Sequence, residues 1–287
     1  MLSASRYLLG VAEIVALAGF ATLGASQLRR RLLPGFSGAP AQLATAVVAL
    51  ALLLWTAELL GSFDLFQPLL YLLAVGVVGV ALRALGPGRF FTSASPAGGA
   101  VGGTAPEEAS ATAGGGGSPA ATGPAGRAPG PSIPTLIALL IAAAAVIHFA
   151  AGVRLRLGTG MTGFDSTWYH GPLAADFFQS GDTWSLHFLA PQYLTWFYPA
   201  NAEIFHAVGM LAFHRDLLSP LLNLGWLLGC LGAAWCIGRP FGAAPLSLAL
   251  AAIALSVPAL ADQAGEARND LAATFFLLAA AATALNA

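Results

Sequence analysis

The chain has 287 residues, of which 57% are hydrophobic and only 9% are charged, and its formal net charge is -1. A soluble domain carries charge on roughly a quarter of its residues, so this composition excludes a soluble globular domain. The near-neutral charge argues against a nucleic-acid-binding protein, which needs a basic surface. A membrane protein remains, because lipid rather than water would then surround most of the apolar surface.

Seven apolar segments approach the roughly 20 residues that a helix needs to cross a bilayer. In lipid every backbone amide must be satisfied within the protein, so these segments are predicted to be helices and not strands. We therefore expect an all-α, polytopic transmembrane bundle of about seven helices. The predicted segments are residues 7–23, 43–60, 65–82, 134–153, 217–237, 243–260 and 271–287.

Residues 86–132 consist almost entirely of Gly, Ala, Pro, Ser and Thr. They hold too few large apolar side chains to offset the entropy of ordering, so we predict a disordered linker. The linker divides the chain into a three-helix N-terminal membrane unit, residues 1–85, and a second membrane unit, residues 133–287.

The arginines give the expected orientation, because loops that face the cytoplasm are enriched in basic residues. Placing the loop that holds residues 29–31 inside puts seven arginines inside and five outside. The N-terminus and the long loop of residues 154–213 are then outside, and the linker is inside. We expect a multi-pass protein of the bacterial inner membrane whose functional face is extracytoplasmic.

The first polar cluster opens this outer loop. Asp165 is suited to cap a helix N-terminus, and Asp165, Tyr169 and Asp176 recur at a spacing that places them on one helix face. Leu173 and Phe177 are predicted to lie against the membrane surface, which would make this an interfacial amphipathic helix.

A second polar cluster precedes the last apolar segment and contains Asp262, Glu266, Arg268 and Asp270. In the expected topology it lies on the same outer face as Asp165. If both clusters build one site, the Asp165 carboxylate should lie within about 10–12 Å of Glu266 or Asp270.

Three short stretches of the outer loop carry a family resemblance: residues 165–172 (DSTWYHGP), 197–203 (FYPANAE) and 215–220 (RDLLSP). They resemble the first outer loop of bacterial GT-C membrane glycosyltransferases, in particular the glycosyltransferase 39-like, protein-mannosyltransferase-type proteins. The resemblance covers residues 134–287. It implies a polyprenyl-phosphate-linked sugar as donor, an acceptor hydroxyl on the extracytoplasmic face, and an essential aspartate in the first outer loop.

The resemblance also implies roles for single residues. Asp165 matches the essential aspartate by context and is expected to deprotonate the acceptor hydroxyl, and Glu266 and Asp270 resemble the family's second-loop acids. Arg268 is the main candidate to stabilise the leaving phosphate, with Arg154 and Arg156 as weaker ones. The residues expected to bind sugar hydroxyls are Tyr169, His170, Tyr198, Asn201 and Glu203.

Two departures from the family matter. Many members carry an adjacent acidic pair where this chain has Asp165 and Ser166, which leaves a divalent metal open. Members also continue for several more helices beyond the position of Ala287, so we expect the chain to be an N-terminal fragment.

Plainer readings stay open for each residue and for the whole chain. Asp165 can be only a helix cap, and Glu266 and Asp270 can be only helix-start charges. The alternative function is a non-catalytic membrane scaffold or a remnant of a glycosyltransferase. A transporter fits less well, because it would place ionisable residues within broken helices at mid-membrane, whereas most acids here lie between the apolar segments.

Overall fold

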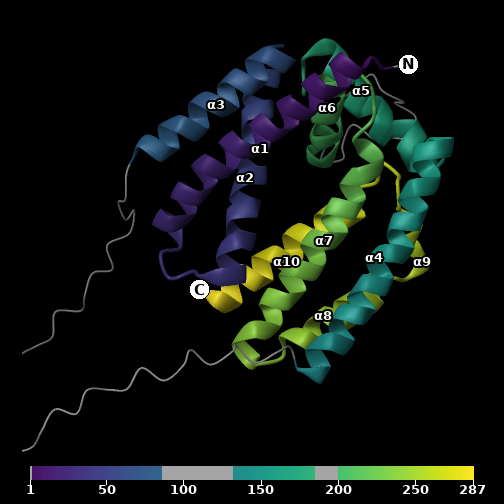
Figure 1. Ribbon diagram of the computed structural model, residues 1–287. Helices are drawn as coiled ribbons and strands as arrows, with labels where there is room; N and C mark the ends of the chain where they lie inside the picture. The colour runs from purple at the N-terminus through teal and green to yellow at the C-terminus, as the bar shows by residue number, and fades with distance from the viewer. Residues whose placement is uncertain (1, 86–131, 185–199) are drawn as a thin grey trace, which may run out of the picture.

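The computed structural model describes residues 2–85, 132–184 and 200–287. All regular secondary structure in these ranges is helical (Figure 1), which confirms the all-α prediction. The predicted linker lies outside the described residues, apart from Ser132 at the start of the fourth helix.

The described residues form a succession of helices and helical turns. In chain order they are α1 (Ala4–Leu32), α2 (Gly38–Gly61), α3 (Pro68–Ala84), α4 (Ile133–Thr159), the π-helical turn η1 (Ser166–His170), α5 (Gly171–Ser180), α6 (Asn201–Phe213), α7 (Ser219–Gly238), the 3₁₀ turn η4 (Arg239–Phe241), α8 (Ala244–Ala254), α9 (Pro258–Ala261) and α10 (Asp270–Asn286).

Four helices, namely α1, α2, α4 and α7 with its 3₁₀ extension, are long and apolar enough to cross a membrane. Their surfaces, and those of the shorter apolar helices, expose large hydrophobic side chains such as Trp55 at 76%, Leu140 at 70% and Leu277 at 72%. Contiguous apolar surface of this kind is rare on soluble monomers, so the fold is that of a membrane protein. The apolar helices α3, α8 and α10 are shorter, and the count of seven crossings stays a prediction.

The predicted segment 243–260 is not one continuous helix. Helix α8 ends at Ala254, and α9 begins at Pro258 after an extended Val257. Proline lacks an amide donor and disfavours the helical conformation of the residue before it. At 1.5 Å per residue α8 is about 16 Å long, roughly half of the hydrocarbon thickness.

Two hydrophobic cores hold the bundle together. The first joins α1, α2 and α3 to α5 and α6, and the second joins α4, α7, α8 and α10. Leu53 and Leu54 on α2 pack against both cores. Helices α1 and α2 therefore pack directly on elements that follow the predicted linker in sequence, α1 on α6 and α2 on α6, α7 and α10 (Figure 1).

The helix ends gather at two opposite ends of the bundle. At the end that we call the site end, the Arg6 guanidinium donates to the carbonyl oxygens of Leu211, at 3.1 Å, and Ala212 in the last turn of α6. At the other end, Asn286 of α10 donates to the Cys236 carbonyl of α7 at 3.0 Å. Arg31 of α1 donates to the carbonyl of Leu85, the residue that follows α3. This second end carries Arg29, Arg30, Arg31, Arg83 and Arg239, and we call it the arginine end.

Helices α1 and α3 touch backbone to backbone. A Cβ atom at Gly79 would overlap the carbonyl oxygen of Phe20, and one at Gly24 would lie 3.0 Å from the Gly79 Cα. Small residues at such contacts let membrane helices approach closely, which strengthens their packing.

Gly79→Ala tests this contact, with Gly76→Ala on the same helix as its matched control. Both changes should gain up to about 1 kcal/mol in helix propensity. At Gly79 the added methyl meets backbone, so a net loss of about 1–3 kcal/mol is expected. At Gly76 it lies 3.6 Å from the Phe20 ring, an ordinary contact. Thermal unfolding in detergent measures both, and equal midpoints for the two variants would contradict the close contact.

Candidate active site

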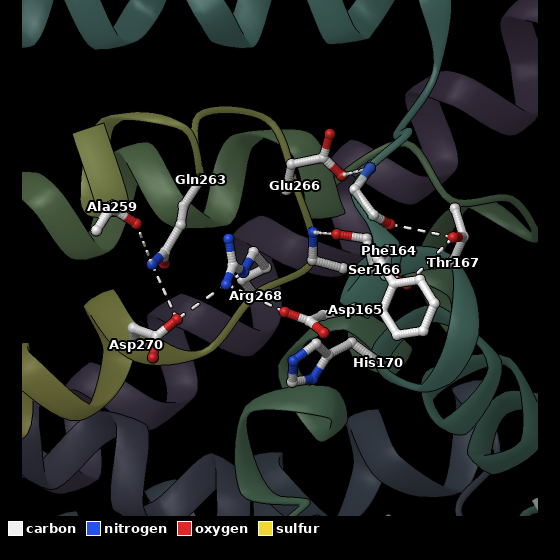
Figure 2. A network of polar contacts seen from close by, with 12 residues as sticks. Phe164, Asp165, Ser166, Thr167, His170, Ala259, Gln263, Glu266, Arg268 and Asp270 are labelled. Carbon is white, nitrogen blue, oxygen red and sulfur yellow. Dashed lines mark hydrogen bonds and ion pairs between the residues drawn. The ribbon is translucent and has the colours of Figure 1, made fainter. Parts of the chain in front are cut away.

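The two polar clusters meet at one arginine (Figure 2). The Nη2 atom of Arg268 lies 3.0 Å from Oδ2 of Asp165, and its Nε atom lies 3.9 Å from Oδ2 of Asp270. Asp165 comes from the segment before η1, whereas Arg268 and Asp270 stand at the start of α10. One guanidinium thus lies between two carboxylates. The structure brings Asp165 together with Arg268 and Asp270, which follow it by about a hundred residues in sequence.

Glu266 lies beside this group, and both of its carboxylate oxygens have bonding partners. Its side chain is 1% exposed and forms an ion pair of 2.8 Å with Nε of Arg156. Its two oxygens also accept hydrogen bonds from the backbone amides of Thr162, at 3.1 Å, and Gly163, at 3.0 Å. Glu266 therefore holds in place the segment that carries Asp165, and Asp270 is the second-loop acid that keeps an exposed carboxylate, at 55%.

The turn after Asp165 is a π-helix, which the sequence did not predict. The amide of Gly171 donates to the carbonyl of Ser166, five residues earlier. A Cβ at Gly171 would lie 2.6 Å from that oxygen, so the turn requires glycine. Asp165 itself has helical backbone angles and makes no capping hydrogen bond with its side chain. The interpretation of Asp165 as a helix cap is therefore wrong, and its side chain is committed to Arg268.

The π-turn directs two side chains into the protein. The hydroxyl of Ser166 accepts a 3.0 Å hydrogen bond from the amide of Ala267, which ties the two clusters together a second time. His170, four residues later, is 3% exposed and contacts the carboxylate of Glu203 on α6 through Nδ1. The placement of the Asp165 segment thus depends on contacts to α6 and to the 262–269 loop.

The prediction that α5 lies on the membrane surface through Leu173 and Phe177 is wrong. Both side chains are buried, at 2% and 0% exposure, in the first core. Helix α5 packs on α6, so its apolar face is covered by protein rather than by lipid.

Two supporting residues were missed by the sequence analysis. The side-chain amide of Asn223, which is fully buried on α7, donates to the carbonyls of Gln263 at 3.2 Å and Glu266 at 2.9 Å. Gln263 in turn donates to Oδ2 of Asp270 at 2.8 Å (Figure 2). An amide side chain within an apolar helix is costly unless it is hydrogen-bonded, and this was the signal that could have identified Asn223.

A cavity of about 420 Å³ opens beside Asp270. Its polar lining comes from Asn201, Asn269 and Asp270, and its apolar lining includes Leu54, Phe205 and Phe276. Asp165 does not line this cavity. It pairs with Arg268, which also pairs with Asp270 of the cavity lining. Among the described residues that were predicted to bind sugar hydroxyls, Asn201 is the one that lines this cavity.

The remaining predicted residues are placed as follows. The Tyr169 ring lies 4.1 Å from the His170 ring, centroid to centroid, Glu203 is buried against His170, and Tyr198 lies outside the described residues. Arg154 is exposed, whereas Arg156 is held by Glu266. Within the described ranges no group of three or more His, Cys, Asp or Glu side chains could hold a metal ion.

Comparisons with protein-family models, with curated proteins and with solved structures found no match.

Glu266→Gln should loosen the Asp165 segment, because an amide offers one oxygen where the carboxylate uses two. Loss of a hydrogen bond to a charged group costs about 1.5–3 kcal/mol, so the amides of Thr162 and Gly163 should exchange with solvent roughly tenfold faster or more. Hydrogen–deuterium exchange of residues 160–166 measures this. Asp262→Asn is the control, because it removes an exposed charge from the same loop; an equal effect of both variants would contradict the assignment.

A buried histidine on α6 should make the fold sensitive to acid. Burial, and to a smaller extent the neighbouring His170, lowers the pKa of His206 to about 3 from its ordinary value of 6.5. Below pH 6.5 the unfolded state binds a proton that the folded state excludes, so stability is lost as the pH falls from 6.5 toward 3.

His206→Gln should therefore flatten the pH dependence of the unfolding temperature over that window, relative to the unmodified chain. His214→Asn is the control, because His214 is exposed and its left-handed backbone, with φ at 53°, suits asparagine. Unfolding curves at about pH 7 and about pH 5 compare them. An unchanged pH dependence in His206→Gln would contradict the role of this residue.

Proposed function

We propose that the protein is a membrane glycosyltransferase that moves a sugar from a polyprenyl-phosphate donor to an acceptor hydroxyl. The observation that carries this proposal is the position of Arg268. Its guanidinium lies between Asp165 and Asp270, and Asp270 lines a cavity whose lining includes both polar and apolar side chains.

A lipid-linked sugar phosphate matches this arrangement in both of its parts. Arginine binds phosphate through several donors held in one plane, and the leaving phosphate of such a donor needs a cation to stabilise its developing charge. The apolar wall of the cavity, formed by Leu54, Phe205 and Phe276 among others, suits the first part of an isoprenoid chain. Asn201 and Asn269 supply hydrogen bonds of the kind that hold sugar hydroxyls.

The ion pairs of Arg268 suggest an order for the proposed reaction. A phosphate that binds Arg268 competes with the carboxylate of Asp165 and releases it. Asp165 then accepts the proton of the acceptor hydroxyl, whose oxygen attacks the anomeric carbon of the sugar. The bond from that carbon to the phosphate oxygen breaks, and the electron pair leaves with polyprenyl phosphate, whose charge Arg268 balances. Asp270 restores the pairing of Arg268 when the product departs.

The site end is proposed to face the outside of a bacterial inner membrane. The family resemblance of residues 165–172, 197–203 and 215–220 supports this orientation. The gathering of arginines at the opposite end also supports it, because basic residues are enriched on the cytoplasmic side of membrane proteins. The competing scaffold function requires none of the pairing around Arg268.

Asp165→Asn should lower donor turnover by about 100-fold or more, since a positioned base contributes roughly 10²–10⁴ to the rate. Membranes that contain the protein are supplied with polyprenyl-phosphate-linked sugars, mannose first, and the release of polyprenyl phosphate is measured. Asp262→Asn, an exposed acid eight residues from Asp270, should leave turnover unchanged. Equal turnover by Asp165→Asn and the unmodified chain, or no release by either, would favour the scaffold.

A further inference from the structure

The arginine end has basic side chains that take no part in the proposed sugar transfer. Among the described residues, no acidic side chain belongs to the segments at this end, which are residues 24–42, 78–85, 132–140, 234–250 and 280–287. Within the described residues, Arg29 and Arg239 therefore face no carboxylate side chain at this end.

Two of these arginines flank the turn between α1 and α2. Arg29 donates through Nη1 to the carbonyl oxygen of Phe36 at 3.3 Å. On the other side of the turn lies Arg239, which is exposed and follows α7. A Cβ atom added at Gly38 would lie 3.4 Å from its Nη1 atom. A polar hollow of about 360 Å³ adjoins this turn and is lined by Ser37, Arg239 and Asn286 among others.

An apolar groove of about 540 Å³ begins one helical turn away from Arg239, between α2 and α7. Its walls include Trp226, Trp235 and Leu43, and its floor includes Gly225, Gly229 and Gly232. Gln42 and Ala46 line both this groove and a second hollow, of about 320 Å³, that is lined by Arg29. The groove therefore leads from the arginines along membrane-spanning helices.

We infer that the arginine end binds an anionic phospholipid, with the phosphate at Arg239 and Arg29 and one acyl chain in the groove between α2 and α7. Charge complementarity identifies the occupant. An arginine cluster at the membrane surface attracts anionic headgroups, and an apolar groove beside it accepts a chain rather than a free phosphate. The site is at the opposite end of the bundle from Arg268 and is independent of the proposed glycosyl transfer.

A second copy of this chain fits the groove less well than a lipid does. Copies inserted in the same direction bring their arginine ends to the same level of the membrane. The exposed Arg83 and Arg239 of one copy would then lie close to those of the other copy, and like charges at an interface repel.

The test counts lipids retained on the purified protein by native mass spectrometry, with phosphatidylglycerol and phosphatidylcholine added in equal amounts to the detergent. We expect at least a threefold preference for phosphatidylglycerol. Arg239→Gln should abolish the preference, whereas Arg83→Gln, an exposed arginine at the same end on α3, should keep it.

The acyl chain is tested with Gly232→Leu, which fills the groove. A Cβ at Gly232 meets nothing within 4 Å, and the same is true of Gly19 on α1, which does not line the groove. Gly232→Leu should lose the bound phosphatidylglycerol, and Gly19→Leu should retain it. Equal retention of both lipids by the unmodified protein, retention by Arg239→Gln, or equal behaviour of the two glycine variants would overturn the inference.

Discussion

The ion pairs of Arg268 are the constraint on which the rest of the site depends. A guanidinium at the edge of a membrane protein is costly unless acidic groups or phosphate balance it. Asp165 and Asp270 supply that balance from two loops that are far apart in sequence. The surrounding contacts fix the positions of the two loops: Glu266 holds residues 162 and 163, and Asn223 holds the loop that contains Glu266.

The guanidinium of Arg268 has N–H donors that a phosphate can bind. Under the proposed function, a phosphate that binds there competes with the two carboxylates for these donors. Asp165 is the partner that lies closer, at 3.0 Å, and Asp270 has Gln263 as a second partner. Under the proposed function, ligand binding and release of the base are coupled through one side chain, which a helix cap or a solvated surface charge would not provide.

Much of the architecture could be predicted from the sequence, because the bilayer restricts apolar segments to helices. The positions of α2, α4 and α7 follow from composition alone, and the break at Pro258 was visible in the sequence although the predicted segment ran through it. The convergence of the two clusters was predictable because both flank apolar segments on the same predicted face. The role of Glu266 could not be predicted, because its partners include the backbone amides of residues 162 and 163, and backbone amides carry no sequence signal. The π-turn at residues 166–170 was also unpredictable, because it shifts side chains off the faces that a regular α-helix would give.

The most direct measurement of the central claim is the affinity for polyprenyl phosphate of the unmodified protein, Asp165→Asn and Arg268→Gln, with polyprenol as the uncharged comparison. If Asp165 and phosphate compete for Arg268, Asp165→Asn should bind polyprenyl phosphate more tightly than the unmodified protein. Arg268→Gln should bind it more weakly, and polyprenol should bind all three alike. A weaker affinity in both variants, or no change in either, would contradict the account.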